Sequence, residues 1–392
     1  MTRRLYHEDA YLRRFEGEVI ARARWKDQPA IVLDRTAFYP EAGGQLGDRG
    51  TLGGVGVVDT QEVDGAILHV LGGEPPAIGT TVVGELDWPR RRQHMAQHTA
   101  QHLLSGALLD RAAAPTASAR LGENALTIDA ARDRIPEAEL AAAEDLANEL
   151  IDDDLPIRAW FPPADELAGL ALRRDPKVDA DIRVVAIGEF DLSPCGGTHC
   201  ARTSQLGVIR IVGAERYKGM TRVTFTAARR GRAELFSRDS VLRGLAAQFS
   251  CGPAEVPQAI DKLRRDAELA GTELTALRGR LAGMLARELL DGGDGAKAGP
   301  IVASLPGDAE LLRGVGAKLV AAGRDAVLCA PDADGSTVVL FRAAGSALDC
   351  GALWKRLAAE VGGRGGGRAD RAEGRLARPI DDWPALVDRC SG

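Results

Sequence analysis

Three histidines are spaced four residues apart in one stretch of the chain, at His94, His98 and His102. Asp87 is a residue type that caps helices and Pro89 suits a first helical turn, so the sequence predicts a helix that begins here. Side chains four residues apart lie on one face of a helix. Two imidazoles one turn apart suit a zinc ion, although a lone pair of this kind is more often an ordinary pair of partly exposed histidines.

A second stretch, SPCGGTHC at residues 193–200, places Cys195 and His199 four residues apart. The segment is too rich in Gly and Pro for a regular helix, and Gly196 and Gly197 allow the backbone to fold so that both side chains converge. Three nitrogens and one sulfur favour Zn²⁺, whereas Cys195 alone would be interpreted as a small buried thiol. Two of the three helix histidines, together with Cys195 and His199, would make a four-ligand zinc site.

The composition narrows the class of protein. The chain has 392 residues, of which 45% are hydrophobic and 27% charged, as expected of a globular protein with two or three domains. No apolar run approaches about 18 residues and no signal-peptide pattern follows the first residues, so we expect a cytoplasmic protein that does not enter a membrane. Its six scattered cysteines suggest reduced thiols. A net charge of −6 argues against indiscriminate nucleic-acid binding but permits a local basic groove.

The predicted fold class is α+β with several domains. Residues 1–87 contain short strands at the spacing of a small N-terminal β-barrel. The expected strands are 16–24, 30–33, 50–59, 66–71 and 80–87. A polar, glycine-rich stretch at 33–48 lies among them; its Gly43-Gly44 pair is either a plain turn or a point where a ligand approaches the backbone. Thr36 and Gln45 would supply hydrogen bonds to such a ligand.

Three further segments follow. Residues 88–230 are predicted to form a zinc-containing α+β domain. Residues 231–295 are predicted to be a helical, coiled-coil linker, because apolar residues alternate steps of three and four from Ile260 to Met284. That seam would pair with a helix near 234–249 or, through residues 257–291, with a second chain. Residues 296–392 are predicted to be an α/β domain whose GGRGGGR stretch at 362–368 is a flexible loop or a phosphate-binding loop.

These motifs resemble those of a known family. HTAQHLL at 98–104 and PCGGTHC at 194–200 resemble the metal motifs of the editing domain of alanyl-tRNA synthetase and of free-standing alanyl-tRNA editing proteins. AFYPEAGGQLGD at 37–48, KGMTRVTF at 218–225 and GGRGGGR are similar to further motifs of that family, in the same order. Since the chain starts directly in the predicted barrel, we expect an editing protein of the long type rather than a synthetase.

The resemblance implies a function. The family hydrolyses, without ATP, the ester between a wrong amino acid, chiefly serine and sometimes glycine, and the alanine-specific tRNA. On the matching positions, the zinc ligands would be His98, His102, Cys195 and His199. His94, on the same helix face, would be a further ligand or a partner of one. Gln45 matches the active-site glutamine, and Thr36 stands where the family contacts the serine hydroxyl. Candidate tRNA contacts are Arg90, Arg91, Lys218, Arg222, Arg364 and Arg368. Two alternatives remain: a non-catalytic tRNA-binding module with structural zinc, and a zinc hydrolase of another ester.

Overall fold

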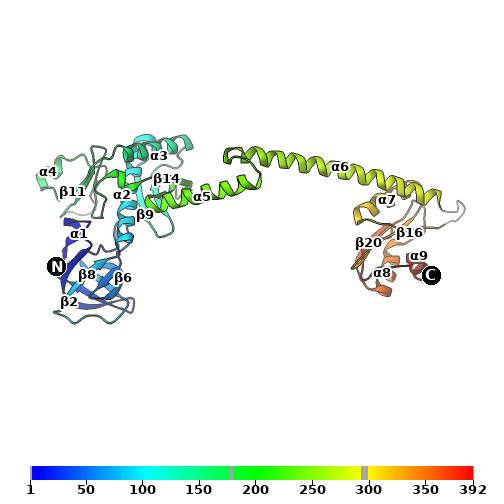
Figure 1. Ribbon diagram of the computed structural model, residues 1–392, viewed down its shortest axis with the longest axis horizontal. Coiled ribbons are helices and arrows are strands. Elements are labelled where there is room, and N and C mark those ends of the chain that lie inside the picture. The colour runs from blue at the N-terminus through cyan, green and yellow to red at the C-terminus, as the bar shows by residue number, and fades with distance from the viewer. Residues whose placement is uncertain (1, 177–179, 293–298, 392) are drawn as a thin grey trace. The chain divides into compact units, whose positions relative to one another are not determined.

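The computed structural model describes residues 2–176, 180–292 and 299–391 (Figure 1). The chain divides into two compact units, Met1–Gly244 and Leu245–Gly392. No helix in these described ranges is both long enough and apolar enough to cross a membrane.

The first unit begins with strands that pair in a ring. Their order is β2-β3-β7-β6-β5-β8, and β8 pairs antiparallel with β2. The strands are β2 (Arg14–Trp25), β3 (Gln28–Leu33), β5 (Gly50–Leu52), β6 (Val55–Val63), β7 (Ala66–Leu71) and β8 (Thr81–Leu86). Along β2 buried and exposed residues alternate, so Phe15 and Val19 face a core inside the ring. The short elements β1 (Arg3–Arg4), α1 (Leu5–Glu8) and β4 (Arg35–Thr36) lie next to these strands in sequence.

One strand that the sequence predicted in this region is two strands in the structure. The sequence predicted a single strand over 50–59, but the chain turns between β5 and β6. Gly53 and Gly54 adopt φ angles of +56° and +84°, which glycine reaches without steric cost. The turn at these glycines ends β5 and begins a hairpin in which β5 pairs with β6. The prediction of one continuous strand was therefore wrong.

The predicted histidine helix is confirmed as α2 (Trp88–Ala112). The Asp87 side chain accepts a hydrogen bond from the Arg90 backbone, as the sequence suggested, and Pro89 occupies the first turn. The helix ends where Ala113 adopts a left-handed conformation. Most of its residues are buried, because other elements of the unit cover it on several sides.

Two larger sheets follow in the first unit, besides the two-stranded pair of β1 and β4. A four-stranded antiparallel sheet of order β14-β15-β10-β9 shares the largest apolar core with α2 and α3, and a second sheet has the order β11-β12-β13. The bounds are β9 (Thr116–Leu121), β10 (Leu126–Ala130), α3 (Glu137–Asp152), β11 (Ile157–Trp160), α4 (Ala164–Gly169), β12 (Val184–Ile187), β13 (Asp191–Pro194), η1 (Thr203–Leu206), β14 (Ile209–Tyr217), β15 (Met220–Ala227) and α5 (Ala228–Gln248). Strand β13 ends immediately before Cys195 and contacts α2. It therefore places the turn at residues 195–199, the cysteine turn, beside this helix.

A buried ion pair joins α2 to the glycine-rich stretch. Arg91 is fully buried and donates to the Asp48 carboxylate through Nε, at 2.8 Å, and through Nη2. The same guanidinium donates to the backbone carbonyls of Ala10 and Ala37. Asp48 also accepts from the Tyr39 backbone N–H at 2.7 Å. Such a pair is tolerated in the interior because each charge has several hydrogen bonds.

The second unit contains a five-stranded sheet of order β16-β17-β18-β20-β19. Its elements are η2 (Pro253–Glu255), α6 (Val256–Asp291), β16 (Ile301–Ser304), α7 (Ala309–Ala321), β17 (Ala326–Asp332), β18 (Gly335–Phe341), α8 (Cys350–Val361), β19 (Gly363–Gly367), β20 (Arg371–Leu376) and α9 (Trp383–Ser391). Helices and strands are both present, as predicted, but in this sheet only β16 and β17 pair parallel, and the pairs β17–β18, β18–β20 and β19–β20 are antiparallel.

The GGRGGGR stretch is not a loop. It forms the edge strand β19, which pairs antiparallel with β20, so both interpretations of it as a loop were wrong. Gly365 and Gly374 face each other across this pair, and a Cβ on either would lie 2.7 or 2.2 Å from Cζ2 of Trp354. The glycines are therefore needed because the indole packs directly against the backbone.

The predicted coiled-coil seam lies on α6. Ala282 and Ala286 near its end pack against α7. The earlier leucines of the seam, such as Leu263, Leu274 and Leu277, are exposed, and their pairing with a second chain stays a prediction. Of the helical linker predicted at 231–295, residues 293–295 lie outside the described part of the chain.

Replacing Arg91 by Met tests the buried ion pair. The change would leave the Asp48 carboxylate buried without its partner, so we expect the first unit to lose about 3–5 kcal/mol of unfolding free energy. Urea unfolding of the full chain measures this loss. Arg92→Met is the control, because Arg92 is exposed; equal midpoints for the two variants would contradict the structural role of the pair.

Candidate metal centre

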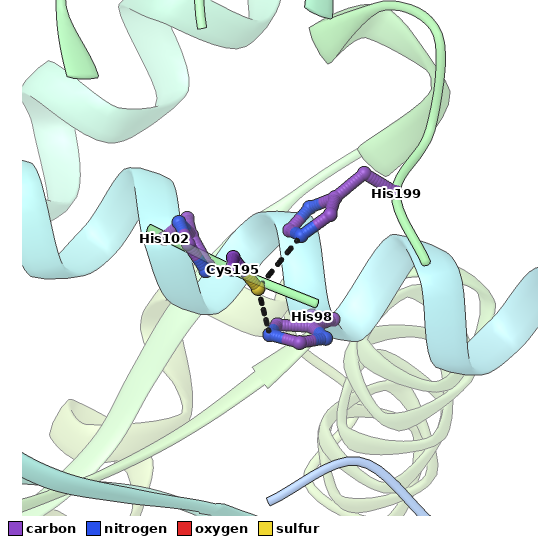
Figure 2. A group of neighbouring side chains, drawn as sticks. All are labelled: His98, His102, Cys195 and His199. Atoms are coloured by element: carbon purple, nitrogen blue, oxygen red, sulfur yellow. Dashed lines mark hydrogen bonds between the residues drawn. The ribbon is translucent and has the colours of Figure 1, made fainter. Parts of the chain in front are cut away.

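Four buried side chains meet between α2 and the cysteine turn. His98, His102, Cys195 and His199 each offer one ligand atom, and these atoms lie within 4.8 Å of one another. Figure 2 shows the three imidazoles around the sulfur, with Nε2 of His98 at 3.5 Å and Nε2 of His199 at 3.3 Å from Sγ. Zinc bond lengths in a tetrahedron separate a nitrogen from a sulfur ligand by about 3.5 Å. The group therefore has the donor types and the spacing to hold a metal ion.

The second nitrogen of His98 is held by Gln45. His98 Nδ1 donates to Gln45 Oε1 at 2.8 Å, and the amide nitrogen of Gln45 donates to Thr198 Oγ1 at 2.9 Å. Because the amide oxygen can only accept, His98 carries its proton on Nδ1 and leaves the Nε2 lone pair free. Gln45 itself is completely buried. The glutamine thus fixes both the ring orientation and the tautomer of His98.

A threonine does the same for His199. The Thr99 hydroxyl donates to the Met95 carbonyl at 2.8 Å, so its lone pairs are available to accept. They receive His199 Nδ1–H at 3.2 Å and the Cys200 backbone N–H at 3.1 Å. The Nε2 atom of His199 is again left free toward Cys195.

A carboxylate supports His102. Its Nδ1 lies 3.4 Å from Asp191 Oδ2, and Arg173 Nε donates to the other oxygen of Asp191 at 2.5 Å. Burial alone would raise the pKa of Asp191, but His102 and Arg173 together lower it to about 2. Asp191 is therefore ionised near neutral pH and orients the ring of His102.

The cysteine turn is shaped by a guanidinium and a glycine. Arg183 Nη1 donates to the carbonyls of Cys195, at 3.0 Å, and Gly197, at 2.8 Å. A Cβ on Gly197 would lie 2.1 Å from Cε1 of His98, whereas one on Gly196 would meet nothing within 4 Å. The two glycines therefore differ: no neighbouring atom of the described residues excludes a Cβ at Gly196, whereas the lack of a Cβ at Gly197 admits the imidazole.

The electrostatics of the group favour the metal-binding form of the thiol. Burial alone would raise the pKa of Cys195, but the coulombic effect of His98, His102 and His199 outweighs it. The pKa of Cys195 lies well below its ordinary value, and the thiolate is the form that binds metals. The adjacent Cys200 is different, since burial raises the pKa of its thiol to about 12.

The structure places the remaining candidate residues elsewhere. Thr36 is fully buried among the strands, where its hydroxyl lies 2.8 Å from His69 Nε2 and accepts from the Phe38 backbone N–H at 3.1 Å. Within the described residues His94 is not a member of the four-residue group, although it lies one turn before His98 on α2. Neither residue adds a ligand to the group.

The candidate tRNA contacts differ in exposure. Lys218, Arg364 and Arg368 are exposed and available to a partner. Arg222 forms a bidentate ion pair with Asp129, and Arg90 is mostly buried beside the glycine-rich stretch. The prediction that Arg91 contacts tRNA does not fit its complete burial.

Sequence reasoning missed the residues that orient the ligands, namely Thr99, Asp191 and Thr198. Each is close in sequence to a ligand, inside or beside the two motifs. A metal-binding histidine usually donates its other N–H to an oxygen. That rule directs attention to nearby residues with side-chain oxygens, but only the folded chain shows which oxygen forms a hydrogen bond with which ring.

Two parts of the chain match known protein families. Residues 182–224 match the family described as the threonyl and alanyl tRNA synthetase second additional domain, and residues 9–90 match the tRNA synthetases class II (A). The first match contains the cysteine turn, and the second contains the glycine-rich stretch.

Similar proteins extend the match over the chain. The alanine–tRNA ligases of Pyrobaculum neutrophilum and Thermococcus kodakarensis are each 34% identical over 99% of this chain. The chain spans 44% and 43% of their respective lengths. The alanyl-tRNA editing protein AlaX-L of Pyrococcus horikoshii is 35% identical over 67% of this chain and 66% of its own length. The resemblance of the motifs is thereby confirmed: the chain belongs to the family of alanine–tRNA ligases and alanyl-tRNA editing proteins.

Proposed function

We propose that this chain is a zinc-dependent hydrolase that removes wrongly attached serine, and also glycine, from alanine-specific tRNA in trans and without ATP. The observation that carries the proposal is the buried group of three imidazoles and one thiol, each imidazole with Nδ1 already engaged and Nε2 turned inward. The name of the editing protein AlaX-L, to which the chain is similar, supports the choice of substrate class.

Hydrolysis of an aminoacyl ester requires only limited activation by such a site. An aminoacyl ester is already activated, so a zinc ion held by the four residues would need only to polarise the carbonyl or orient a water. The protein's own task is to position the ribose and the amino acid and to exclude bulk water. We assign Gln45 a positioning role in this task, since its amide is bonded to His98 and Thr198.

A second candidate function is tRNA binding with a structural metal. Four protein ligands are the usual number for a structural zinc, whereas catalytic sites keep a position open. This observation favours a module that binds tRNA without hydrolysis. The two candidates differ in whether purified protein deacylates a mischarged tRNA.

We also infer an organisation for the chain. The ring of strands would be the small barrel of residues 1–87, followed by an editing domain at 88–230, a helical linker at 231–295 and a C-terminal domain at 296–392. The last boundary falls outside the described residues. A homodimer would form through residues 257–291, whose leucine seam is exposed.

The direct test combines deacylation with metal analysis. Full-length protein should carry about one zinc per chain, release serine from Ser-tRNA of the alanine type, and spare correctly charged Ala-tRNA. Cys195→Ser should lose the zinc and at least about 100-fold in deacylation rate, since a hydroxyl is a poor zinc ligand. Cys200→Ser is the matched control, because Cys200 is buried beside the group but not part of it.

Three outcomes would contradict the proposal. Purified protein that contains no stoichiometric metal would contradict the proposed zinc site. A Cys195→Ser variant with unchanged deacylation would separate the site from the reaction. Normal tRNA binding with no deacylation would support the second candidate.

Gly197→Ala tests the close approach of the turn to His98. The new Cβ would displace the imidazole, so we expect zinc affinity to fall by about 10–100-fold. Competition with a chromogenic chelator measures this affinity. Gly196→Ala should bind zinc like the unaltered chain, because its Cβ meets nothing within 4 Å; matching losses in both variants would argue against this steric account.

Thr36→Val tests the predicted contact with the substrate hydroxyl. The threonine oxygen keeps one lone pair beyond its bonds to His69 and Phe38, and that lone pair would accept from serine. We expect deacylation of Ser-tRNA to fall about 10-fold more than that of Gly-tRNA. Thr60→Val, another fully buried threonine of the ring, should affect both substrates alike. Equal loss on both substrates in Thr36→Val would leave Thr36 a purely structural role.

A further inference from the structure

A histidine near the start of the chain reaches the cysteine turn. His7 belongs to the short helix α1, and its Nε2 lies 3.0 Å from the backbone carbonyl oxygen of Gly196. A carbonyl oxygen can only accept a hydrogen bond, so this nitrogen carries a proton and donates it. His7 therefore joins the N-terminal segment to the middle of the turn, between Cys195 and Gly197.

Packing and hydrogen bonds fix the position of His7. Strand β1 pairs parallel with β4, and the Thr2 hydroxyl donates to the Leu33 carbonyl at 2.7 Å, so the residues before α1 are anchored to the ring of strands. The centroid of the His7 ring lies 4.6 Å from that of Tyr6, which is buried, and 5.6 Å from that of Phe161. The direction of the donor is therefore set by its aromatic neighbours and not by the carbonyl alone.

The carbonyl that His7 holds shares a peptide plane with a donor to the metal-site sulfur. The peptide bond from Gly196 to Gly197 is trans, so its C=O and N–H point in opposite directions within one rigid plane. The N–H of this plane, on Gly197, donates to Sγ of Cys195 at 3.4 Å. An anchor on the carbonyl therefore also sets the direction of the N–H toward the sulfur.

This peptide plane depends on an anchor because of its two residues. Both are glycines, so no Cβ restricts rotation of the plane. The carbonyls of Cys195 and Gly197 are held by Arg183. The carbonyl of Gly196 accepts instead from His7, at an exposed point of the turn. A water could replace this bond, but it would not fix the direction of the carbonyl.

A hydrogen bond to a metal-binding sulfur changes the properties of that ligand. An N–H that donates to a thiolate withdraws electron density from the sulfur and so alters its bond to a metal. It also restricts where the sulfur can lie. Figure 2 shows the Cys195 sulfur among the three imidazoles, so a change at Sγ would act on the whole group.

We propose that His7 is a positioning residue of the metal site, which holds the peptide plane between Gly196 and Gly197 and thereby directs the Gly197 N–H to the Cys195 sulfur. His7 acts through the backbone and is not one of the four ligands. The proposal rests on the metal site of the proposed function but not on deacylation.

Full-length protein loaded with cobalt tests the role of His7, because Co²⁺ bound to a thiolate shows a sulfur-to-metal charge-transfer band. His7→Phe keeps an aromatic ring beside Tyr6 but removes the donor, so the band should shift and the zinc affinity should fall by about 10-fold. His7→Gln supplies an amide N–H at a similar reach and should bring both quantities back toward those of the unaltered chain. Absorption spectra measure the band, and competition with a chromogenic chelator measures the affinity.

Tyr11→Phe is the matched control, since Tyr11 also links the N-terminal segment to this region. Its hydroxyl accepts from the Ala201 backbone N–H at 2.8 Å, beyond His199 and away from the peptide plane that His7 holds. This variant should therefore leave the charge-transfer band in place. Urea unfolding of each variant shows whether it is folded.

A measurement on the unaltered protein does not depend on any variant. In protein loaded with an NMR-active isotope of cadmium, the Gly197 amide proton should show a scalar coupling to the metal through its hydrogen bond to Cys195 Sγ. Absence of this coupling would overturn the proposal whatever the variants show.

The outcomes separate this proposal from the proposed function. With metal bound, an unmoved band in His7→Phe, or an equal shift in Tyr11→Phe, would overturn the role of His7 even if Ser-tRNA is deacylated. A shift that His7→Gln reverses and Tyr11→Phe lacks would support it, even if no deacylation were seen. Protein that takes up neither cobalt nor cadmium would overturn both proposals.

Discussion

The contact between α2 and the glycine-rich stretch is the interaction on which the rest of the first unit depends. Gln45, Gly47 and Asp48 each bond to a different residue of the helix, at His98, Arg90 and Arg91. The Arg91–Asp48 pair is completely buried, so it is stable only if both partners and their backbone hydrogen bonds are in place together. This cooperativity fixes the stretch against the helix and thereby positions Gln45 beside the metal ligands.

The metal centre shows how a rigid helix and a bent turn can share one site. His98 and His102 are placed by helix geometry, whereas Cys195 and His199 depend on a turn that other residues must shape. In each imidazole the bond at Nδ1 sets the tautomer before any ion arrives. A site prepared in this way loses little conformational freedom on binding, which favours affinity.

Much of this was accessible from the sequence because it depends on local rules. The cap at Asp87, the spacing of the histidines and the alternation in the strands follow directly from helix and strand periodicity. The four ligands were also predicted from spacing and residue type. What could not be predicted depends on tertiary packing. The GGRGGGR stretch pairs as a strand with β20, and the absence of a side chain at Gly365 leaves room for Trp354. Arg91 is internal because Asp48, distant in sequence, pairs with it.

The guanidinium of Arg183 has a consequence for the way an ion would enter and leave. Its Nη1 donates to the backbone carbonyls of Cys195 and Gly197, on either side of Gly196, and so links the two ends of this part of the cysteine turn. These two hydrogen bonds involve no metal-ligand atom, so they constrain the backbone of the turn independently of an ion. The site is therefore preorganised for an ion, and exchange of the ion would not require this turn to refold.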